Sequence, residues 1–125
     1  ARLAALQITD EQLERLDVLC GQMKEEYGRA DRWQVLAVNR EFYAVLYAIP
    51  NRPRLYDLTM KYLDMANLYR RMAVAQERYF KRIIEGHEEL LAALRERDSE
   101  GVERVLRVQM EEIREMLQEV IHKGE

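Results

Sequence analysis

The sequence of 125 residues predicts an all-α fold, an antiparallel helical bundle in a single domain. Hydrophobic residues make up 48% of the chain and charged residues 34%, with only 5 Gly and 2 Pro, a composition typical of helical proteins rather than turn-rich β-proteins. Apolar side chains recur every three or four residues along most of the chain. Short connections join the segments that carry this spacing, and they favour antiparallel neighbours around one core.

The first full helix is expected to begin at Thr9 and to end at Gly28. Thr9 and Gln12 form the two ends of a capping box, and glycine commonly follows a helix. The expected buried stripe is Leu13, Leu16, Cys20, Met23 and Tyr27. Residues 1–6 already look like the middle of an amphipathic helix, so we expect this chain to be part of a longer protein.

The second helix is expected to start at a cap formed by Asp31 and Gln34, and Pro50 and Pro53 separate it from the third. Its stripe is Val35, Asn39, Phe42, Leu46 and Ile49, with Tyr43 beside Phe42. The third helix repeats the spacing, which predicts a buried stripe of Leu55, Leu58, Tyr62, Met65, Tyr69 and Met72.

From Ala73 to Tyr79 the pattern blurs without any Gly or Pro, and both a break and a continuous long helix are compatible with it. The spacing then resumes as Phe80, Ile83, His87, Leu90 and Leu94. Asp98 is the expected N-cap of the last helix. The stripe of that helix is Val102, Leu106, Gln109, Ile113, Met116 and Val120.

Charge and cysteine content narrow the function classes. A net charge of -3 argues against direct binding of nucleic acid by this chain, because phosphate neutralisation requires a basic surface. Cys20, the single cysteine, occupies an apolar stripe and is expected to be a buried thiol in a reducing compartment. No apolar run approaches the roughly 20 residues of a membrane span, and no signal peptide is visible. We expect a cytoplasmic protein with no membrane partner.

No catalytic signature is present. A carboxylate-bridged di-iron site needs Glu-x-x-His pairs on two helices, and His87 has no Glu at that spacing. Cys20 lies deep in a stripe and Ser99 starts a helix, so neither suits a nucleophile. Gly-rich phosphate loops and Cys-x-x-Cys pairs are also missing from the sequence. We therefore expect that the protein is not an enzyme and uses no cofactor.

Polar residues interrupt the apolar stripes of three helices at Asn39, His87 and Gln109. Burying such groups is costly unless they find hydrogen-bond partners. Each has a structural explanation when taken alone: a core histidine can be satisfied by a neighbour, a buried amide can fix helix register, and Tyr43 and Tyr69 can be core aromatics. Taken together, they favour a shared internal pocket that holds water or a ligand.

The spacing of these residues resembles the C-terminal effector-binding (FCD) domain of FadR-like transcriptional regulators of the GntR family. The resemblance covers nearly the whole chain, and the interval from His87 to Asp98 and Gln109 is its specific part. The family's motifs are matched here by Asn39-Arg40-Glu41-Phe42-Tyr43, then by Gly86-His87, Leu90 and Asp98, and finally by Val102, Leu106 and Gln109. The resemblance implies a bundle of the FadR C-terminal-domain type.

Many members of the family bind a divalent metal through an aspartate and three histidines, and the matching positions here are Asn39, Tyr43, His87 and Gln109. Only the histidine is retained, and two amides and a phenol are poor metal ligands, so we expect no metal. Members that lack the metal ligands use the same cavity for an effector. The resemblance therefore implies a metal-free ligand site formed by Asn39, Tyr43, Tyr69, His87 and Gln109.

The resemblance also implies a function: residues 1–125 would be the metabolite-sensing domain of a bacterial regulator whose N-terminal winged-helix domain lies outside this chain. All the expected site residues can donate hydrogen bonds, which suits a small organic acid or acyl-type metabolite. A homodimer that touches DNA only through the missing domain is expected. The alternative from another class is a structural helical bundle with no ligand pocket.

Overall fold

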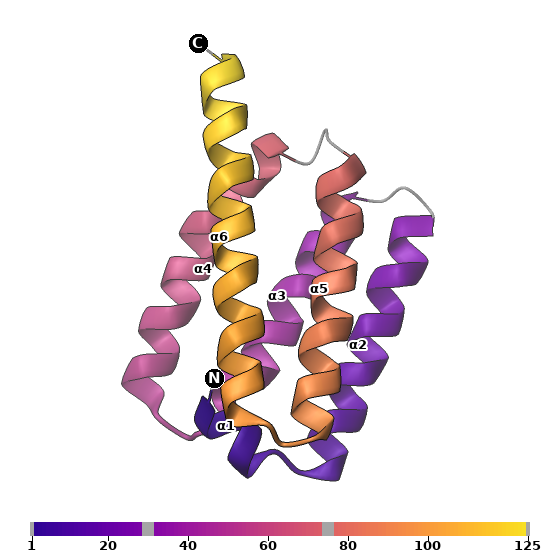
Figure 1. The fold of residues 1–125 in the computed structure, drawn as a ribbon, viewed down its shortest axis with the longest axis vertical. Helices are drawn as coiled ribbons and strands as arrows, with labels where there is room; N and C mark the ends of the chain where they lie inside the picture. Colours follow the sequence, from indigo (N-terminus) through magenta and orange to yellow (C-terminus); the bar gives the residue numbers. More distant parts are fainter. Residues whose placement is uncertain (1, 29–31, 74–76, 125) are drawn as a thin grey trace.

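The computed structural model describes residues 2–28, 32–73 and 77–124, except for the side chains of residues 32, 66–73, 77–80, 113, 116, 117 and 120–124. The described chain forms helices α1 (Arg2–Gln7), α2 (Asp10–Gly28), α3 (Arg32–Ala48), α4 (Pro53–Ala73), α5 (Glu77–Arg95) and α6 (Ser99–Gly124). Each of the helices from α3 to α6 runs antiparallel to the one before it (Figure 1). The predicted all-α antiparallel bundle is therefore confirmed.

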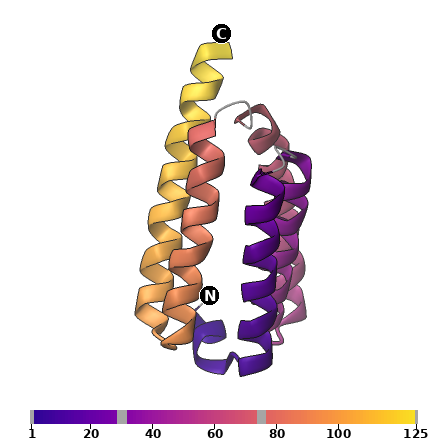
Figure 2. The same ribbon diagram turned by 90° about the vertical axis from the view of Figure 1, so that its right-hand side faces the viewer.

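The helices pack in two layers. Figure 2 shows α5 and α6 in one layer and α2, α3 and α4 in the other, with α1 at the end where α2 begins. Around the bundle the helices follow the order α2, α3, α4, α6, α5, and each contacts its neighbours in this ring, with α5 also next to α2. The short helix α1 contacts α6. The question left open at residues 73–79 is answered by two separate helices, α4 and α5, although residues 74–76 themselves lie outside the description.

Two of the predicted helix starts are visible in their hydrogen bonds. The Thr9 amide donates to Gln12 Oε1 at 2.9 Å and the Gln12 amide donates to Thr9 Oγ1 at 3.2 Å, which completes the capping box. At α6 the Gly101 amide donates to Asp98 Oδ1 at 3.0 Å, as an N-cap requires. The expected cap at Asp31 falls outside the described residues.

The core follows the predicted stripes of α2, α3 and α5. Its buried members include Leu16, Cys20, Met23, Phe42, Leu46, Leu90 and Leu94. Desolvation by burial raises the pKa of the Cys20 thiol, which outweighs the opposing effect of nearby Lys24. None of the helices in the described ranges is both long and apolar enough to cross a membrane.

The prediction that the stripe of α4 is buried is wrong for the side chains that the structure describes. Leu55, Leu58, Tyr62 and Met65 are 55%, 63%, 72% and 60% exposed, whereas Met60 on the opposite side of the helix is buried. Apolar spacing shows that a helix has an apolar face but does not say what covers it. Here α4 turns the Met60 side toward α3 and α6, and its predicted core face points outward. The side chains of Tyr69 and Met72 are not described.

Ion pairs connect neighbouring helices. Arg40 of α3 donates to both carboxylate oxygens of Asp64 in α4, at 2.6 and 3.2 Å, and this hydrogen bonding lowers the pKa of Asp64. Arg82 of α5 bonds to Glu89 in its own helix and to Glu112 of α6. These contacts fix α4 against α3 and α5 against α6, the two pairs of helices that flank the candidate site.

Candidate functional site

His87 lies at the centre of the buried polar residues. Helix α5 places it in the interior, 2% exposed, with its Nδ1 atom 2.7 Å from the Ile83 carbonyl oxygen one turn earlier. A carbonyl oxygen only accepts hydrogen bonds, so this contact assigns the ring proton to Nδ1. The rings of Phe42 and Tyr43 from α3 pack on the imidazole, with centroid distances of 4.6 and 5.3 Å.

Gln109 reaches the same region from α6. Its Nε2 atom donates to the Gly86 carbonyl oxygen at 2.7 Å, and Gly86 directly precedes His87. Gly86 makes room for this amide, since a Cβ at that position would lie only 2.8 Å from Gln109 Nε2. In the sequence Gly86 is recognisable only as part of a motif, and this role was not predicted. The available signal was a glycine inside an otherwise regular helix, which often marks close packing.

Asn39 and Tyr43 complete the described part of the predicted set. Both are buried in α3, with Asn39 one turn before Tyr43. The Asn39 Nδ2 group is buried and has no hydrogen-bond partner in the part of the chain that the structure describes. Tyr43, His87 and Gln109 are thus linked by direct or adjacent contacts, and Asn39 lies one turn away. The fifth predicted residue, Tyr69, lies outside the described side chains.

The donor atoms of this buried cluster, defined as Asn39, Tyr43, His87 and Gln109, do not suit a divalent metal. The cluster offers two neutral amides, a phenol and one imidazole, whose Nδ1 already faces a backbone carbonyl. Protein sites for such metals use thiolate, carboxylate or several imidazole ligands. The chemistry of the cluster is therefore that of hydrogen bonding to neutral or anionic oxygen.

A cavity of about 540 Å³ lies beside the buried cluster, between α3, α4 and α6. No residue of the cluster lines it. The lining side chains are mainly apolar or aromatic with charged groups at the edge, namely Tyr47, Pro50, Arg52, Leu55, Tyr56, Thr59, Glu103, Leu106, Arg107, Met110, Glu111 and Arg114. These residues were not predicted as a site, because only their position across three helices brings them together.

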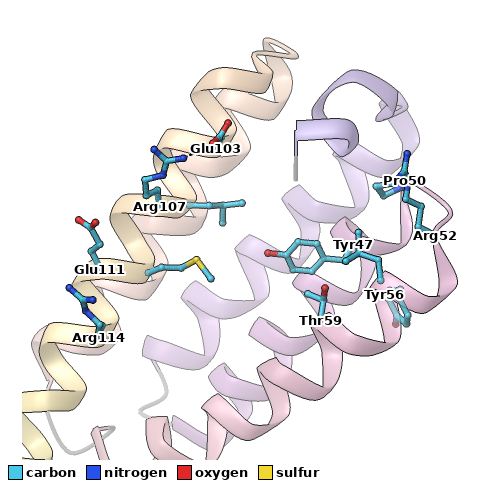
Figure 3. A pocket seen from close by; sticks show the side chains of 12 residues that line it. Tyr47, Pro50, Arg52, Tyr56, Thr59, Glu103, Arg107, Glu111 and Arg114 are labelled. Carbon is cyan, nitrogen blue, oxygen red and sulfur yellow. Dashed lines mark hydrogen bonds and ion pairs between the residues drawn. The ribbon is translucent and has the colours of Figure 1, made fainter.

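Figure 3 shows how the polar groups of the cavity are directed. Tyr47 extends from α3 toward α6, and Thr59 of α4 lies beside it, whereas Glu111 and Arg114 project from α6 away from α3 and α4. The Tyr47 ring also stacks on Tyr43, with a centroid distance of 5.8 Å and an interplanar angle of 15°. Tyr47 therefore lines the cavity and also contacts the buried cluster through Tyr43.

The edge of the cavity is largely neutralised. Glu103 forms ion pairs with Arg107, at 2.5 Å, and with Arg2, at 3.1 Å. Within residues 2–28, 32–73 and 77–124, no ion pair is formed by Arg52, Glu111 or Arg114. Glu111 and Arg114 project away from α3 and α4 (Figure 3), so Arg52 is the unpaired charge on the α3 and α4 side of the cavity.

Comparison with known proteins assigns the family. The comparisons with curated proteins and with solved structures returned no match. The family model of the FCD domain matches residues 1–120, almost the entire chain. Together with the all-helical fold, this match confirms the resemblance seen in the sequence. The chain belongs to the FCD domain family, the C-terminal effector-binding domains of GntR-family transcriptional regulators.

Proposed function

We propose that the cavity between α3, α4 and α6 binds a small organic acid or acyl-type metabolite and that its occupancy controls DNA binding by a homodimeric regulator. In this proposal the DNA is held by a winged-helix domain N-terminal to residues 1–125. The observation that carries the proposal is a sizeable cavity next to buried polar groups, in a domain of an effector-binding family.

The character of the cavity supports an acyl-type ligand in particular. Its volume of about 540 Å³ falls within the range of ligand sites, roughly 300–1,000 Å³. Leu55, Leu106 and Met110 offer apolar surface to a hydrocarbon chain, and the hydroxyl groups of Tyr47 and Thr59 offer hydrogen bonds. An anionic head group of the ligand would lie at the edge, within reach of Arg52. A small and highly charged acid would leave most of the apolar wall unused.

The buried cluster forms the polar floor of the proposed site, beyond Tyr47. Asn39 Nδ2 is a buried donor that gains a partner if a ligand carbonyl or a ligand-associated water reaches it. Tyr43, His87 and Gln109 stand next to it as further hydrogen-bonding groups, and Tyr69 is retained as a proposed fifth member. In this proposal the Tyr47 side chain lies between the cavity and the polar floor, and it must change its rotamer before a ligand can reach the floor.

The switch itself requires a difference in affinity. A ligand shifts the arrangement of the two DNA-binding domains only by binding one arrangement more tightly than the other. Such a difference arises if the two arrangements hold α4 differently against α3 and α6, because all three helices line the cavity.

A thermal-shift series tests the proposal. Saturated fatty acids and acyl thioesters of increasing chain length are compared with short dicarboxylic acids on this chain. A ligand at a hundredfold its dissociation constant adds about 2.7 kcal/mol to the free energy of unfolding, which is readily seen as a raised Tm. We expect the acyl series to give the larger shifts and the dicarboxylic acids the smaller ones.

Matched variants then locate the binding. Met110→Trp fills the cavity from α6, and Val108→Trp places the same ring on an exposed position of α6 that does not line the cavity. We expect Met110→Trp to abolish the ligand-induced shift and Val108→Trp to preserve it. Binding that survives Met110→Trp but disappears in His87→Ala would move the site into the buried cluster. A protein that no member of either series stabilises would favour the structural alternative.

A further inference from the structure

Helix α4 presents an apolar face that nothing in the described chain covers. Leu55, Leu58, Tyr62 and Met65 repeat at three- and four-residue spacing, and each is more than half exposed, with Leu55 at the boundary between this face and the cavity. Single exposed apolar residues are ordinary, but a contiguous stripe of large ones marks an interaction surface. The helix lies at the edge of the bundle (Figure 1), where this face is accessible to another molecule.

Charged residues accompany the stripe in a regular order. Arg54, Asp57, Lys61 and Asp64 each directly precede one stripe residue, so they form a row along one side of the stripe. Their charges alternate as positive, negative, positive and negative along the helix. All four are exposed. This row identifies what the face is suited to bind.

The row is complementary to itself in one orientation only. When two copies of α4 pack antiparallel about a two-fold axis, each helix turns the same side of its stripe toward the same side of the other. A residue of one copy then faces the residue of the second copy for which the two residue numbers add up to one fixed total, twice the number of the residue at the axis. With the axis near Thr59, Asp57 faces Lys61 of the second copy, and Arg54 faces Asp64 of the second copy. In a parallel pair, by contrast, the charged row of each copy would face the other side of the second copy's stripe, so the two rows would not meet.

The apolar stripe fits nearly the same register. It is symmetric about Met60, so that Leu58 faces Tyr62 of the second copy and Leu55 faces Met65 of the second copy. This centre is one residue from the centre of the charged row, so the two registers differ by a slide of two residues, about 3 Å along the helix. Long side chains such as that of Lys61 readily span this offset. The two patterns therefore favour one arrangement.

We propose that a second copy of this chain docks on this face, with the two α4 helices antiparallel and Asp57 paired with Lys61 in both directions. The proposal rests on the homodimer of the proposed function and names its interface. Within the described residues, Asp57 and Lys61 form no ion pair, so both are available. Asp64 already binds Arg40, at 2.6 Å, and Arg54 of the second copy would extend that pair. The inner pair between Asp57 and Lys61 therefore sets the register.

Charge exchange tests the interface directly, with the dissociation constant of the dimer measured by sedimentation equilibrium at low salt. Asp57→Lys and Lys61→Asp each replace two attractive pairs by two repulsive ones, and we expect each to weaken the dimer by about tenfold, since exposed pairs contribute about 0.2–1 kcal/mol each. The double variant Asp57→Lys/Lys61→Asp restores both pairs and should dimerise like the original protein. Lys81→Asp, on an exposed position of α5, is the control for the change in net charge.

Mixing the two single variants gives the sharpest result. The heterodimer of Asp57→Lys with Lys61→Asp regains both attractive pairs, so it should form in preference to either homodimer. Leu58→Asp should abolish dimerisation while the far-UV circular dichroism stays helical. Single variants that dimerise as tightly as the original, or a mixture without preferred heterodimers, would overturn the proposed register.

The original protein remaining a monomer at all concentrations would overturn the interface. That outcome would leave the ligand site untouched, because the comparison of Met110→Trp with Val108→Trp is made on ligand-induced stabilisation of the same chain. Conversely, a dimer that shows the charge-exchange pattern but binds no ligand would refute the proposed sensor and keep the interface.

Discussion

Replacing Gly86 by alanine probes how tightly α5 and α6 are held together at the buried cluster. Alanine in a helix interior is favoured over glycine by about 1 kcal/mol, so the substitution would stabilise an isolated α5. In the protein, however, the new Cβ would lie 2.8 Å from Gln109 Nε2 and displace the amide from its 2.7 Å hydrogen bond to the Gly86 carbonyl. Leaving buried hydrogen-bonding groups unsatisfied costs about 1–3 kcal/mol.

Gly86→Ala should therefore change the free energy of unfolding by between zero and about 2 kcal/mol, in the destabilising direction. Gly21→Ala is the matched control, because Gly21 lies in α2 with nothing within 4 Å of a Cβ there, and it should stabilise the protein by about 1 kcal/mol. The two free energies are measured by urea denaturation followed by circular dichroism at 222 nm.

A double-mutant cycle isolates the cause. Once Gln109→Ala has removed the amide, Gly86→Ala meets no obstacle and should stabilise that variant by about 1 kcal/mol, like Gly21→Ala. The reasoning fails if Gly86→Ala stabilises the original protein as much as Gly21→Ala does. In that case Gln109 is not confined by Gly86, and its hydrogen bond contributes nothing measurable.

Other predictions concern the cap of α6, the buried thiol and the lost metal ligands. Asp98→Ala should lower the free energy of unfolding by about 1 kcal/mol in chemical denaturation, whereas Asp98→Asn, which keeps the capping oxygen, should lower it far less. Because burial raises the pKa of the Cys20 thiol and shields its sulfur from solvent, Cys20 should react much more slowly with a disulfide reagent in the folded than in the urea-unfolded protein; equal rates would contradict its burial. The triple variant Asn39→Asp/Tyr43→His/Gln109→His restores the donors that the family resemblance implies, and elemental analysis should find zinc or nickel in it at near-stoichiometric levels; a metal-free product would mean that these side chains do not converge.

The helix boundaries were predictable because they depend on local chemistry. The capping box at Thr9, the N-cap at Asp98 and the prolines at 50 and 53 act on their own turns and need no partner from elsewhere in the chain. The burial of His87 and Gln109 was predictable for a related reason, since both interrupt stripes whose described members, such as Leu90, Leu94 and Val102, belong to the core. The family resemblance added the expectation that these residues belong to a single site.

The cavity and the orientation of α4 depend on how helices are placed relative to each other, which helical spacing does not encode. Tyr47, Thr59 and Met110 carry no mutual pattern in the sequence, yet three helices bring them to one cavity. The contact of Gly86 with Gln109 requires the register of α5 against α6. The stripe of α4 was recognised correctly as apolar, but its described members were assigned wrongly to the core, because an exposed apolar face has the same spacing as a core face.

Helix α4 takes part in both proposed events, effector binding in the cavity and self-association of two chains. Leu55 and Thr59 of α4 line the cavity, while Leu58 and Tyr62 point outward. If both proposals hold, effector binding and self-association are thermodynamically coupled, and the coupling must be reciprocal. The apparent affinity for the effector would then vary with the concentration of the regulator itself, and a cell that makes more of this protein would also change the metabolite level to which it responds.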